Sequence, residues 1–467
     1  MKRRTFLATA AGASTALALG TTTTASASGR SDGGTEALLR RWFRDTCRSI
    51  EALTTDFGLT ADTMDVTAST LTPSVNTSPT NIGCGLWATV AAGGLGVIDA
   101  TTMRRRLDRT VSAVERLERA HGFWFNWYDA YTGETLTAWP DSGDPVDPFL
   151  SSVDNAWLIT GLRLAADADP SLRPRVARLL ADADWSFYYT PYDASAPATN
   201  PGQLHGGYSM GTESFTSHWY GTLNTEPRMA SYLGIADGSL PGEHYWHTDR
   251  TLPPGTEQGQ QPEGAWVTVD GVRLWRGHYT YRGRTFLPSW GGSMFEALMV
   301  PLFVPEAQWS PGAWGLNHQR YVRSQIEHGM IEEGYGYWGF SPANVPAGGY
   351  ATYGVPALAT SVDGYPSGGV VTPHASFLAM PFARDEAITN LRRIARDFGA
   401  YEDGIGFRDS VDVTTGRVSD HVLALDQGMI VAALAQVLKP GLLQVPFSSG
   451  GFARRVRPLL SKESFGI

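Results

Sequence analysis

The segment HVLALDQGMIVAALAQVL, residues 421–438, decides the fold class. It has helical periodicity, and residues 430–438 are apolar around nearly the whole circumference of that helix. Such a helix must be covered by other elements on more than one side. The segment therefore predicts a large helical domain with buried helices. Its one acidic residue, Asp426, stands out, because an ionised carboxylate is rarely left unpaired in a core.

Helical patterns of similar length recur along the chain. The expected helices are 36–57, 80–97, 102–120, 151–168, 172–188, 226–236, 291–302, 316–330, 373–380, 385–398 and 421–438, with a short twelfth at 355–360. No low-complexity linker separates them. We predict one all-α domain, residues 36–438, with long loops on one face and a tail, residues 439–467, packed on its outside.

Strand-like alternation is confined to residues 265–284, where VTVDGVRLWRG turns at Asp270-Gly271. This pattern predicts a small β-hairpin excursion from a loop. The stretches 194–217 and 243–284 are expected to be long insertions that shape a cleft.

Composition excludes several classes. The 467 residues are 42% hydrophobic and 18% charged, which excludes a disordered chain and a membrane bundle. A net charge of −9 argues against a nucleic-acid partner, which would need clustered cations. Two cysteines, Cys47 and Cys84, exclude a disulfide scaffold, although they leave one pairing open.

The first 27 residues have the pattern of an export signal. Arg3-Arg4 precedes an apolar run that is too short to span a membrane, and Ala25-Ser26-Ala27 resembles a cleavage site. The arginine pair matches a twin-arginine signal. We expect a secreted, periplasmic or cell-surface protein that has no membrane segment after cleavage; the sequence makes no prediction of oligomeric state.

Aromatic residues gather where loops are expected, in FWFNWYDAY (123–131), LPSWGGSMFE (287–296) and YGYWGFSPAN (335–344). Core packing explains most aromatic residues, but three clusters beside glycine-rich turns favour a cleft. Because sugar rings stack on Trp and Tyr, we expect a carbohydrate substrate. The candidate substrate-binding residues are Trp124, Trp127, Asp129, Arg228, Trp290, Trp338, Tyr350, His374 and Asp426.

Carboxylates beside apolar runs are candidates for chemistry. Asp154 and Glu226 stand at the starts of expected helices, where a structural role as a helix-end acceptor also explains them. Glu296 lies one turn inside an apolar helix, where a solvated position does not explain it. Asp409, in a glycine-containing loop with Arg408, is expected at the surface. The histidines show no zinc-binding spacing, so we predict no metal and no cofactor.

Six segments resemble the glucoamylase-like superfamily, which includes endo-β-1,2-glucanases and the C-terminal domain of cyclic β-1,2-glucan synthases. They are TSPTNIGCGL (77–86), FWFNWYDAYTGE (123–134), SSVDNAWL (151–158), TEPRMASYLGIADG (225–238), SWGGSMFEALM (289–299) and LDQGMIVAAL (425–434). The resemblance covers about residues 38–438 and implies an (α/α)6 barrel, or toroid, with a substrate cleft at one end. It implies glycoside hydrolysis, with catalysis associated with Asp154 and Glu226 and with Glu296 in the cleft.

Glycosidases pair one protonated carboxyl with one ionised carboxylate. Our hypothesis makes Glu226 the general acid and Asp154 the base, with Glu296 as the alternative for either. Ser341-Pro342-Ala343-Asn344 replaces an acidic residue of the synthase pattern, which favours inversion over retention and transfer. Two other readings are open: a non-catalytic carbohydrate-binding protein on the same scaffold, or a polysaccharide lyase. A lyase would use residues such as His318, Arg320, Tyr321 and His374.

Overall fold

The computed structural model describes residues 28–467; the predicted export signal, residues 1–27, lies outside the described residues. The helices are α1 Ser28–Leu53, α2 Pro79–Gly94, α3 Ala100–Val114, α4 Ser152–Ala168, α5 Arg173–Leu180, α6 Arg228–Asp237, α7 His244–His247, α8 Met294–Leu298, α9 Glu306–Trp309, α10 Leu316–Glu327, α11 Pro373–Ala379, α12 Arg384–Phe398, α13 Ala424–Leu438, α14 Val445–Ser448 and α15 Gly450–Lys462. The predicted dominance of helices is confirmed.

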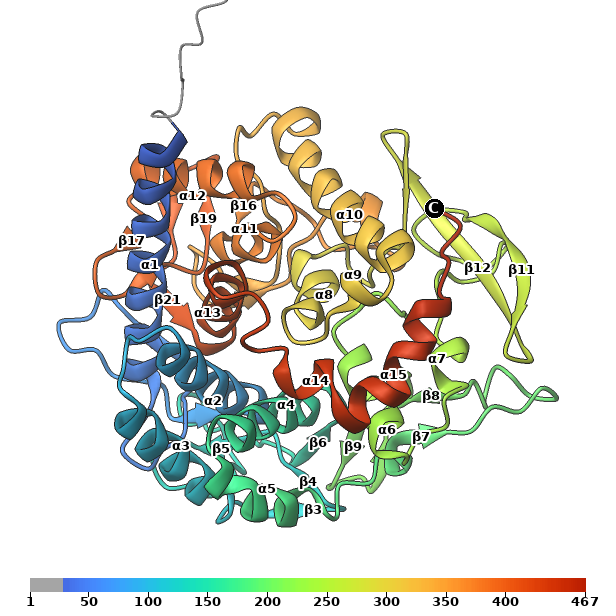
Figure 1. Ribbon diagram of the computed structural model, residues 1–467, viewed down its shortest axis with the longest axis horizontal. Helices are drawn as coiled ribbons and strands as arrows, with labels where there is room; N and C mark the ends of the chain where they lie inside the picture. The colour runs from blue at the N-terminus through green and yellow to red at the C-terminus, as the bar shows by residue number, and fades with distance from the viewer. Residues whose placement is uncertain (1–27) are drawn as a thin grey trace, which may run out of the picture.

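Helices α2, α4, α6, α8, α11 and α13 form an inner ring (Figure 1). Packing contacts join α2 to α4, α4 to α6, α8 to α11, α11 to α13 and α13 back to α2. The remaining junction is made by Arg228 of α6, whose guanidinium donates 2.8 Å to the carbonyl oxygen of Ala297 in α8. The ring therefore closes on itself around a buried centre.

A second layer of helices backs the ring on the outside. Helix α1 packs on α13, α3 on α2, α5 on α4, α10 on α8 and α12 on α11. The remaining inner helix, α6, is backed by α15 from the C-terminal tail. The end of the tail is fixed by the buried ion pair between Arg250 and Glu463 and by Phe465, which packs edge-on against Trp314. The tail thus completes the outer layer.

Several helices are shorter in the structure than the sequence predicted, for local reasons. Residues 291–302 yield only α8 and a 3-10 turn, Val300–Leu302, because Gly292 has φ +83° and Pro301 interrupts the helix. Residues 172–188 yield α5 and the 3-10 turn Trp185–Tyr188. The predicted short helix at 355–360 is a single 3-10 turn, Pro356–Leu358.

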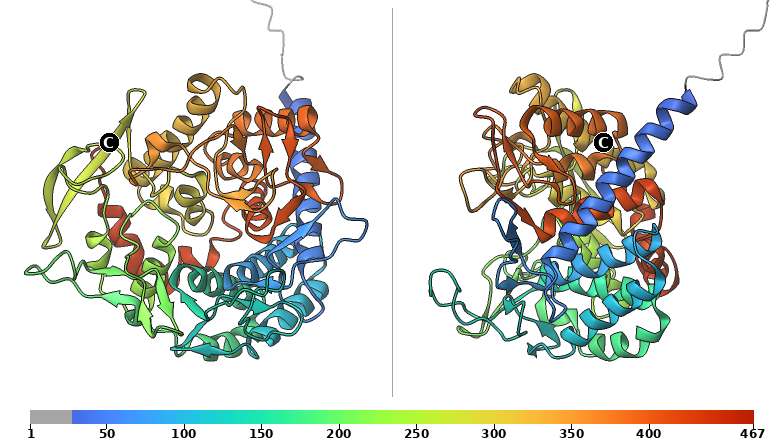
Figure 2. Two further views of the ribbon diagram at one scale, coloured as in Figure 1. Left: turned by 180° about the vertical axis from the view of Figure 1, so that it is seen from behind. Right: turned by 90° about the vertical axis from the view of Figure 1, so that its left-hand side faces the viewer.

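Strands are short and more numerous than the sequence predicted, so the expectation of one hairpin is corrected. The pairs are β1 Thr63–Asp65 with β21 His421–Leu423, β2 Asn76–Thr77 with β5 Tyr128–Asp129, β3 Arg119–Ala120 with β4 Phe123–Trp124, β7 Tyr189–Thr190 with β8 Gln203–Leu204, β14 Ala343–Asn344 with β15 Tyr350–Ala351, and β17 Tyr401–Glu402 with β18 Gly406–Phe407. The side view on the right of Figure 2 shows many of the loops gathered at one end of the ring.

Three sheets have three strands each: β6 Phe149–Ser151, β9 Gly207–Ser209 and β10 Ser214–Phe215; β11 Glu263–Val269, β12 Val272–Tyr281 and β13 Arg284–Phe286; and β16 Val370–Val371, β19 Val411–Asp412 and β20 Arg417–Val418. The hairpin β11–β12 turns at Asp270-Gly271 as predicted. No helix of residues 28–467 combines the length and hydropathy needed to cross a membrane. Cys47 and Cys84 are both buried free thiols.

Helices α2 and α4 approach closely because glycines meet between them. A Cβ atom at Gly83 would lie 2.5 Å from the carbonyl oxygen of Trp157, and one at Gly161 would lie 2.9 Å from the Cα of Gly83. We expect Gly83→Ala to lower the free energy of unfolding by about 1–3 kcal/mol, because it overpacks a backbone contact. Chemical denaturation measures the change. Gly312→Ala is the control, since a Cβ there meets nothing within 4 Å; equal stabilities for the two variants would contradict the account.

Candidate active site

One end of the inner ring carries a polar side chain on the first turn of every inner helix, or just before it. These are Thr80 of α2, Asp154 of α4, Glu226 before α6, Glu296 of α8, His374 of α11 and Asp426 of α13. The amino ends of helices carry partial positive charge, which stabilises carboxylates placed there. The fold therefore gathers acidic groups at one place without burying a cation beside each one.

Glu296 is held as a hydrogen-bond acceptor. Its carboxylate accepts bonds from Ser289 Oγ at 2.6 Å, from the Gly291 N–H at 3.0 Å and from the Ser293 N–H at 3.0 Å. Ser293 in turn caps α8, so the two residues form a reciprocal capping box. Burial raises the pKa of Glu296, and these hydrogen bonds oppose that effect. The donors favour the ionised form of Glu296.

Glu226 has the opposite environment. Its Oε2 atom is buried and has no hydrogen-bond partner among the described residues. Burial, followed by the charge of Glu296, raises the pKa of Glu226 to about 8, with a smaller contribution from Asp154. At neutral pH the proton of this pair of glutamates therefore resides on Glu226. A protonated carboxyl beside a carboxylate that hydrogen-bond donors stabilise is the arrangement that general-acid chemistry requires.

Asp154 lies beside Glu226 and faces an open groove. Its Oδ1 accepts a 2.5 Å hydrogen bond from Thr80 Oγ1, and Ser151 caps the helix by accepting from the Asp154 N–H. The groove next to it is lined by Trp127 and Tyr220 among others. The Asp154 carboxylate is thus held in place by Thr80 and is accessible to solvent from the groove.

A second group of carboxyls continues the site. Burial raises the pKa of Asp62, Asp409 and Asp426, and Asp426 further raises that of Asp409. His374 Nδ1 lies 3.1 Å from Asp426 Oδ2, and burial lowers the pKa of His374 to about 3, so the imidazole is neutral.

The prediction that Asp409 lies at the surface is wrong: it is 1% exposed and its Oδ1 accepts from the Leu423 N–H. We call Asp62, Asp154, Glu226, Glu296, Asp409 and Asp426 the acidic cluster.

Tyrosine and tryptophan side chains surround the acidic cluster. Tyr350 is 54% exposed, yet the enclosed position of its hydroxyl raises its pKa, with Asp426 and Glu226 contributing. Tyr365 packs where a Cβ at Gly291 would collide with its ring, and its pKa is raised by burial and by Glu296 and Glu226. Trp290 is 49% exposed on the turn before α8. These rings are placed at the rim as a carbohydrate cleft requires.

Four predicted binding residues have structural roles instead. Trp124 and Trp338 are buried in the core, so the prediction that they contact substrate is corrected. Arg228 is buried and pairs with Glu306 at 2.8 Å, which fixes α6 against α8 and α9. Asp129 Oδ1 accepts from the N–H groups of Tyr131 and Thr132, so it closes a turn. These positions satisfy the burial or hydrogen-bonding needs of the fold.

The residues that would serve a lyase are not assembled. His318 is buried and its Nε2 lies 3.1 Å from Glu306 Oε2. Tyr321 is buried, and its hydroxyl lies 2.8 Å from Ser289 Oγ. Arg320 donates to the carbonyl oxygen of Thr285. Arg320 and His318 thus have partners outside the acidic cluster, so the lyase alternative loses its proposed cation and one of its candidate bases.

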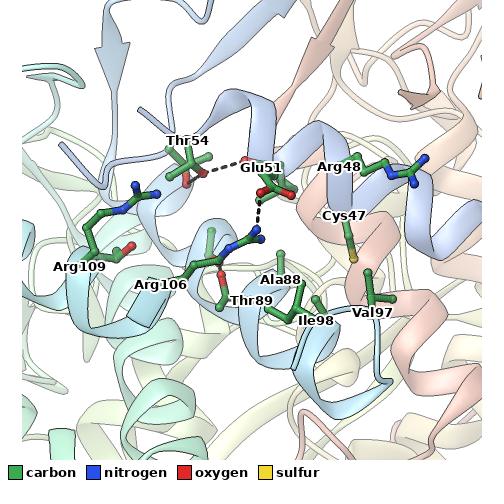
Figure 3. Close-up of a pocket in the computed structure, with 15 residues that line it drawn as sticks. Cys47, Arg48, Glu51, Thr54, Ala88, Thr89, Val97, Ile98, Arg106 and Arg109 are labelled. Atoms are coloured by element: carbon green, nitrogen blue, oxygen red, sulfur yellow. Dashed lines mark hydrogen bonds and ion pairs between the residues drawn. The ribbon is translucent and has the colours of Figure 1, made fainter. Parts of the chain in front are cut away.

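A separate pocket lies among α1, α2 and α3 (Figure 3). It is lined by Cys47, Arg109 and the ion pair of Glu51 with Arg106, and no member of the acidic cluster contributes to it. In residues 28–467, no group of three or more His, Cys, Asp or Glu side chains is arranged to hold a metal ion.

Sequence reasoning missed several residues of the site: Asp62, Thr80, Trp139, Tyr220 and Tyr365. Thr80 lies in the segment 77–86, which carries the family resemblance, but was not singled out as a site residue, and the other four lie in loops without apolar periodicity. Asp62 alone had a local feature that could have marked it as a site residue. It directly follows a short stretch that contains the buried apolar residues Leu59 and Ala61.

Comparisons with known proteins agree with this fold. Residues 263–450 match the family model described as "Putative glucoamylase". The chain is 29% identical over 307 residues to the cyclic β-(1,2)-glucan synthase NdvB of Rhizobium meliloti, a match that covers 63% of this chain and 9% of that protein. The chain therefore corresponds to a small part of that relative.

Two solved structures of similar fold are endo-β-1,2-glucanases. The enzyme from Chitinophaga pinensis, in complex with sophorotriose and glucose, has a TM-score of 0.66 and 16% identity, covering 91% of this chain and 97% of that one. A mutant of the enzyme from Talaromyces funiculosus, in complex with β-1,2-glucan, has a TM-score of 0.67 and 13% identity, covering 92% and 90%. Together the comparisons confirm the resemblance to the glucoamylase-like superfamily.

The raised pKa of Glu226 has a measurable effect on stability. Between its ordinary pKa of 4.5 and about 8, the folded protein keeps a proton that the unfolded chain has lost, so stability falls as pH rises across this window. Glu226→Gln removes that titration. We expect thermal unfolding to show the variant gaining stability relative to the parent as pH rises from about 5 to about 8. The difference should level off above that range.

The exposed residue Glu386, in the first turn of α12, supplies the control. Glu386→Gln removes a carboxylate of the same type outside the acidic cluster. A stability difference between Glu226→Gln and the parent that stays constant with pH would contradict the protonation assigned to Glu226.

Proposed function

We propose that the protein is a glycoside hydrolase that cleaves β-1,2-glucan or a closely related bacterial glycan. The observation that carries this proposal is the contrast within the acidic cluster: the buried Oε2 atom of Glu226 has no hydrogen-bond partner among the described residues, whereas the carboxylate of Glu296 accepts from three donors that favour its ionised form. Glycosidic cleavage uses such a split pair of carboxyls. The substrate class is supported by the two endo-β-1,2-glucanases of similar fold.

The scaffold proposed for this activity is an (α/α)6 barrel. The six inner helices contact one another in sequence around the ring, and each is backed by an outer helix. Carboxyls on successive inner helices then face a common cleft at the amino ends. The aromatic rim of Trp127, Trp290 and Tyr350 supplies flat surfaces on which sugar rings can stack.

In the proposed reaction, Glu226 donates its proton to the glycosidic oxygen as the bond from that oxygen to the anomeric carbon breaks. Asp154 accepts a proton from the water that attacks the anomeric carbon, so the products are two shorter sugars with free hydroxyls. Burial and the nearby charge of Glu296 favour the protonated form of Glu226 beforehand, and the Glu296 carboxylate stabilises the developing positive charge on the sugar ring.

Hydrolysis with inversion is favoured over transfer. In the segment 341–344, Ser341 is buried and its Oγ accepts from the Phe295 N–H, while Asn344 Nδ2 donates to Thr63 Oγ1. Neither side chain is a carboxylate that can act as a nucleophile. Water held by Asp154 is the acceptor that the proposal requires.

We also propose that the protein acts outside the cytoplasm, carried there by the twin-arginine signal in residues 1–27. Export would bring the enzyme to a polymeric glucan outside the cytoplasm. The twin-arginine route carries proteins that have folded before they cross the membrane.

Substitution of the two assigned carboxyls tests the function. With β-1,2-glucan as substrate, we expect Glu226→Gln and Asp154→Asn each to lower kcat by about 10²–10⁴-fold, the usual contribution of acid–base groups. Release of reducing ends measures turnover, and product size separates endo from exo cleavage. The anomer released first should be the inverted one.

Matched controls come from α12, whose first turn carries Asp385 and Glu386 in exposed positions. Asp385→Asn and Glu386→Gln are expected to keep parental turnover. Near-parental kcat in both Glu226→Gln and Asp154→Asn would refute the catalytic assignment. Binding of the glucan with no turnover by the parent would instead favour the carbohydrate-binding alternative.

A further inference from the structure

An open groove leads away from Asp154 across the surface of the loops. Its lining comes from the turn that contains Asn126 and Trp127, from the loop that contains Trp139, and from Asp154 and Tyr220. The groove is thus continuous with the acidic cluster but extends past it. Its lining therefore includes residues that the cleavage chemistry does not use.

Two tryptophans of this groove are not needed for the core. Trp127 and Trp139 are partly exposed, and within the described chain neither belongs to the hydrophobic core that contains Trp124 and Trp157. Their ring centroids lie 5.7 Å apart and the planes are inclined at 55°. Two large aromatic rings left open to solvent beside a reactive carboxylate indicate a binding surface.

The Trp139 side chain is carried on an ordered loop. The Trp139 N–H donates to the Asp144 carbonyl at 2.8 Å, and the Val146 N–H donates to the Thr137 carbonyl at 2.9 Å. Asp147 ties this loop to its neighbour, because its Oδ1 accepts from the Gly211 N–H at 2.8 Å and its Oδ2 accepts from Ser209 Oγ. Trp139 is therefore presented in a fixed position before any ligand arrives, which reduces the entropic cost of binding.

The groove also contains an unused polar atom. Asn126 Oδ1 is buried and has no hydrogen-bond partner among residues 28–467, although the Asn126 backbone pairs with Phe149. A buried carbonyl oxygen without a donor costs free energy, which a ligand hydroxyl would recover. Aromatic faces with one acceptor match a pyranose ring, which has C–H faces and equatorial hydroxyls.

We propose that this groove is a sugar-binding subsite that holds one pyranose ring of the glycan chain on Trp139, with Trp127 as the second wall and Asn126 Oδ1 as hydroxyl acceptor. The inference rests on the proposed function, because the same chain must also reach Glu226 and Asp154. Since the groove is open, the chain extends along it, and longer oligosaccharides bind more tightly than a disaccharide that fills only the cleavage site.

Binding measurements test the subsite without relying on turnover. Isothermal titration calorimetry of the Glu226→Gln protein with linear β-1,2-gluco-oligosaccharides compares Trp139→Ala and Trp139→Phe with their parent. We expect Trp139→Ala to weaken hexasaccharide affinity about tenfold or more, as truncation of a tryptophan anchor does, and to change disaccharide affinity little. Trp139→Phe should retain most of the affinity, because it keeps an aromatic face.

The matched control is Trp266→Ala, because Trp266 is 49% exposed on β11 and does not line the groove. Its hexasaccharide affinity should equal that of the parent.

Equal affinities for Trp139→Ala and Trp266→Ala would overturn the subsite and leave the proposed function standing. Loss of affinity in Trp139→Ala, with full turnover in Glu226→Gln, would support the subsite and refute the catalytic assignment. Failure of the parent to bind any oligosaccharide would overturn both the subsite and the β-1,2-glucan substrate.

Discussion

The structure depends on the convergence of the amino ends of six inner helices on one group of carboxyls. Thr80, Asp154, Glu296, His374 and Asp426 each lie in the first turn of a different inner helix. Helix dipoles and free N–H groups at these ends compensate negative charge that the interior would otherwise reject. This constraint explains why acids appear on otherwise apolar helices and why the loops at this end are long: they must cover the cluster while admitting a ligand.

The same constraint separates the two central glutamates. Glu296 lies inside a helix start and collects its donors from the turn that precedes it, whereas Glu226 stands before Pro227, and its Oε2 atom has no donor within the described chain. One carboxyl is therefore stabilised as an anion and the other as an acid. The difference comes from backbone placement, because the donors to Glu296 belong to the turn that precedes α8.

Periodicity in the sequence predicted the helices and the carboxyls that lie on them, because apolar runs and helix starts are local features. Asp154, Glu296 and Asp426 were identifiable for that reason. Trp124 and Trp338 were misassigned because an aromatic residue beside a glycine turn has the same local pattern in the core and at a rim. Asp409 and Trp139 depend on loop conformations fixed by distant partners, which no local pattern records. Leu423 donates a hydrogen bond to Asp409, and Gly211 donates one to Asp147 in the loop that carries Trp139.

The central claim is that burial, together with the charge of Glu296, keeps Glu226 protonated at neutral pH. The pH dependence of kcat/KM for glucan cleavage tests it directly, because its alkaline limb reports the pKa of the essential acid in the free enzyme. The account predicts an alkaline limb near pH 8 in the parent and a shift of that limb to lower pH in Glu296→Gln, which removes a neighbouring charge. An alkaline limb that stays in place in Glu296→Gln would contradict the account.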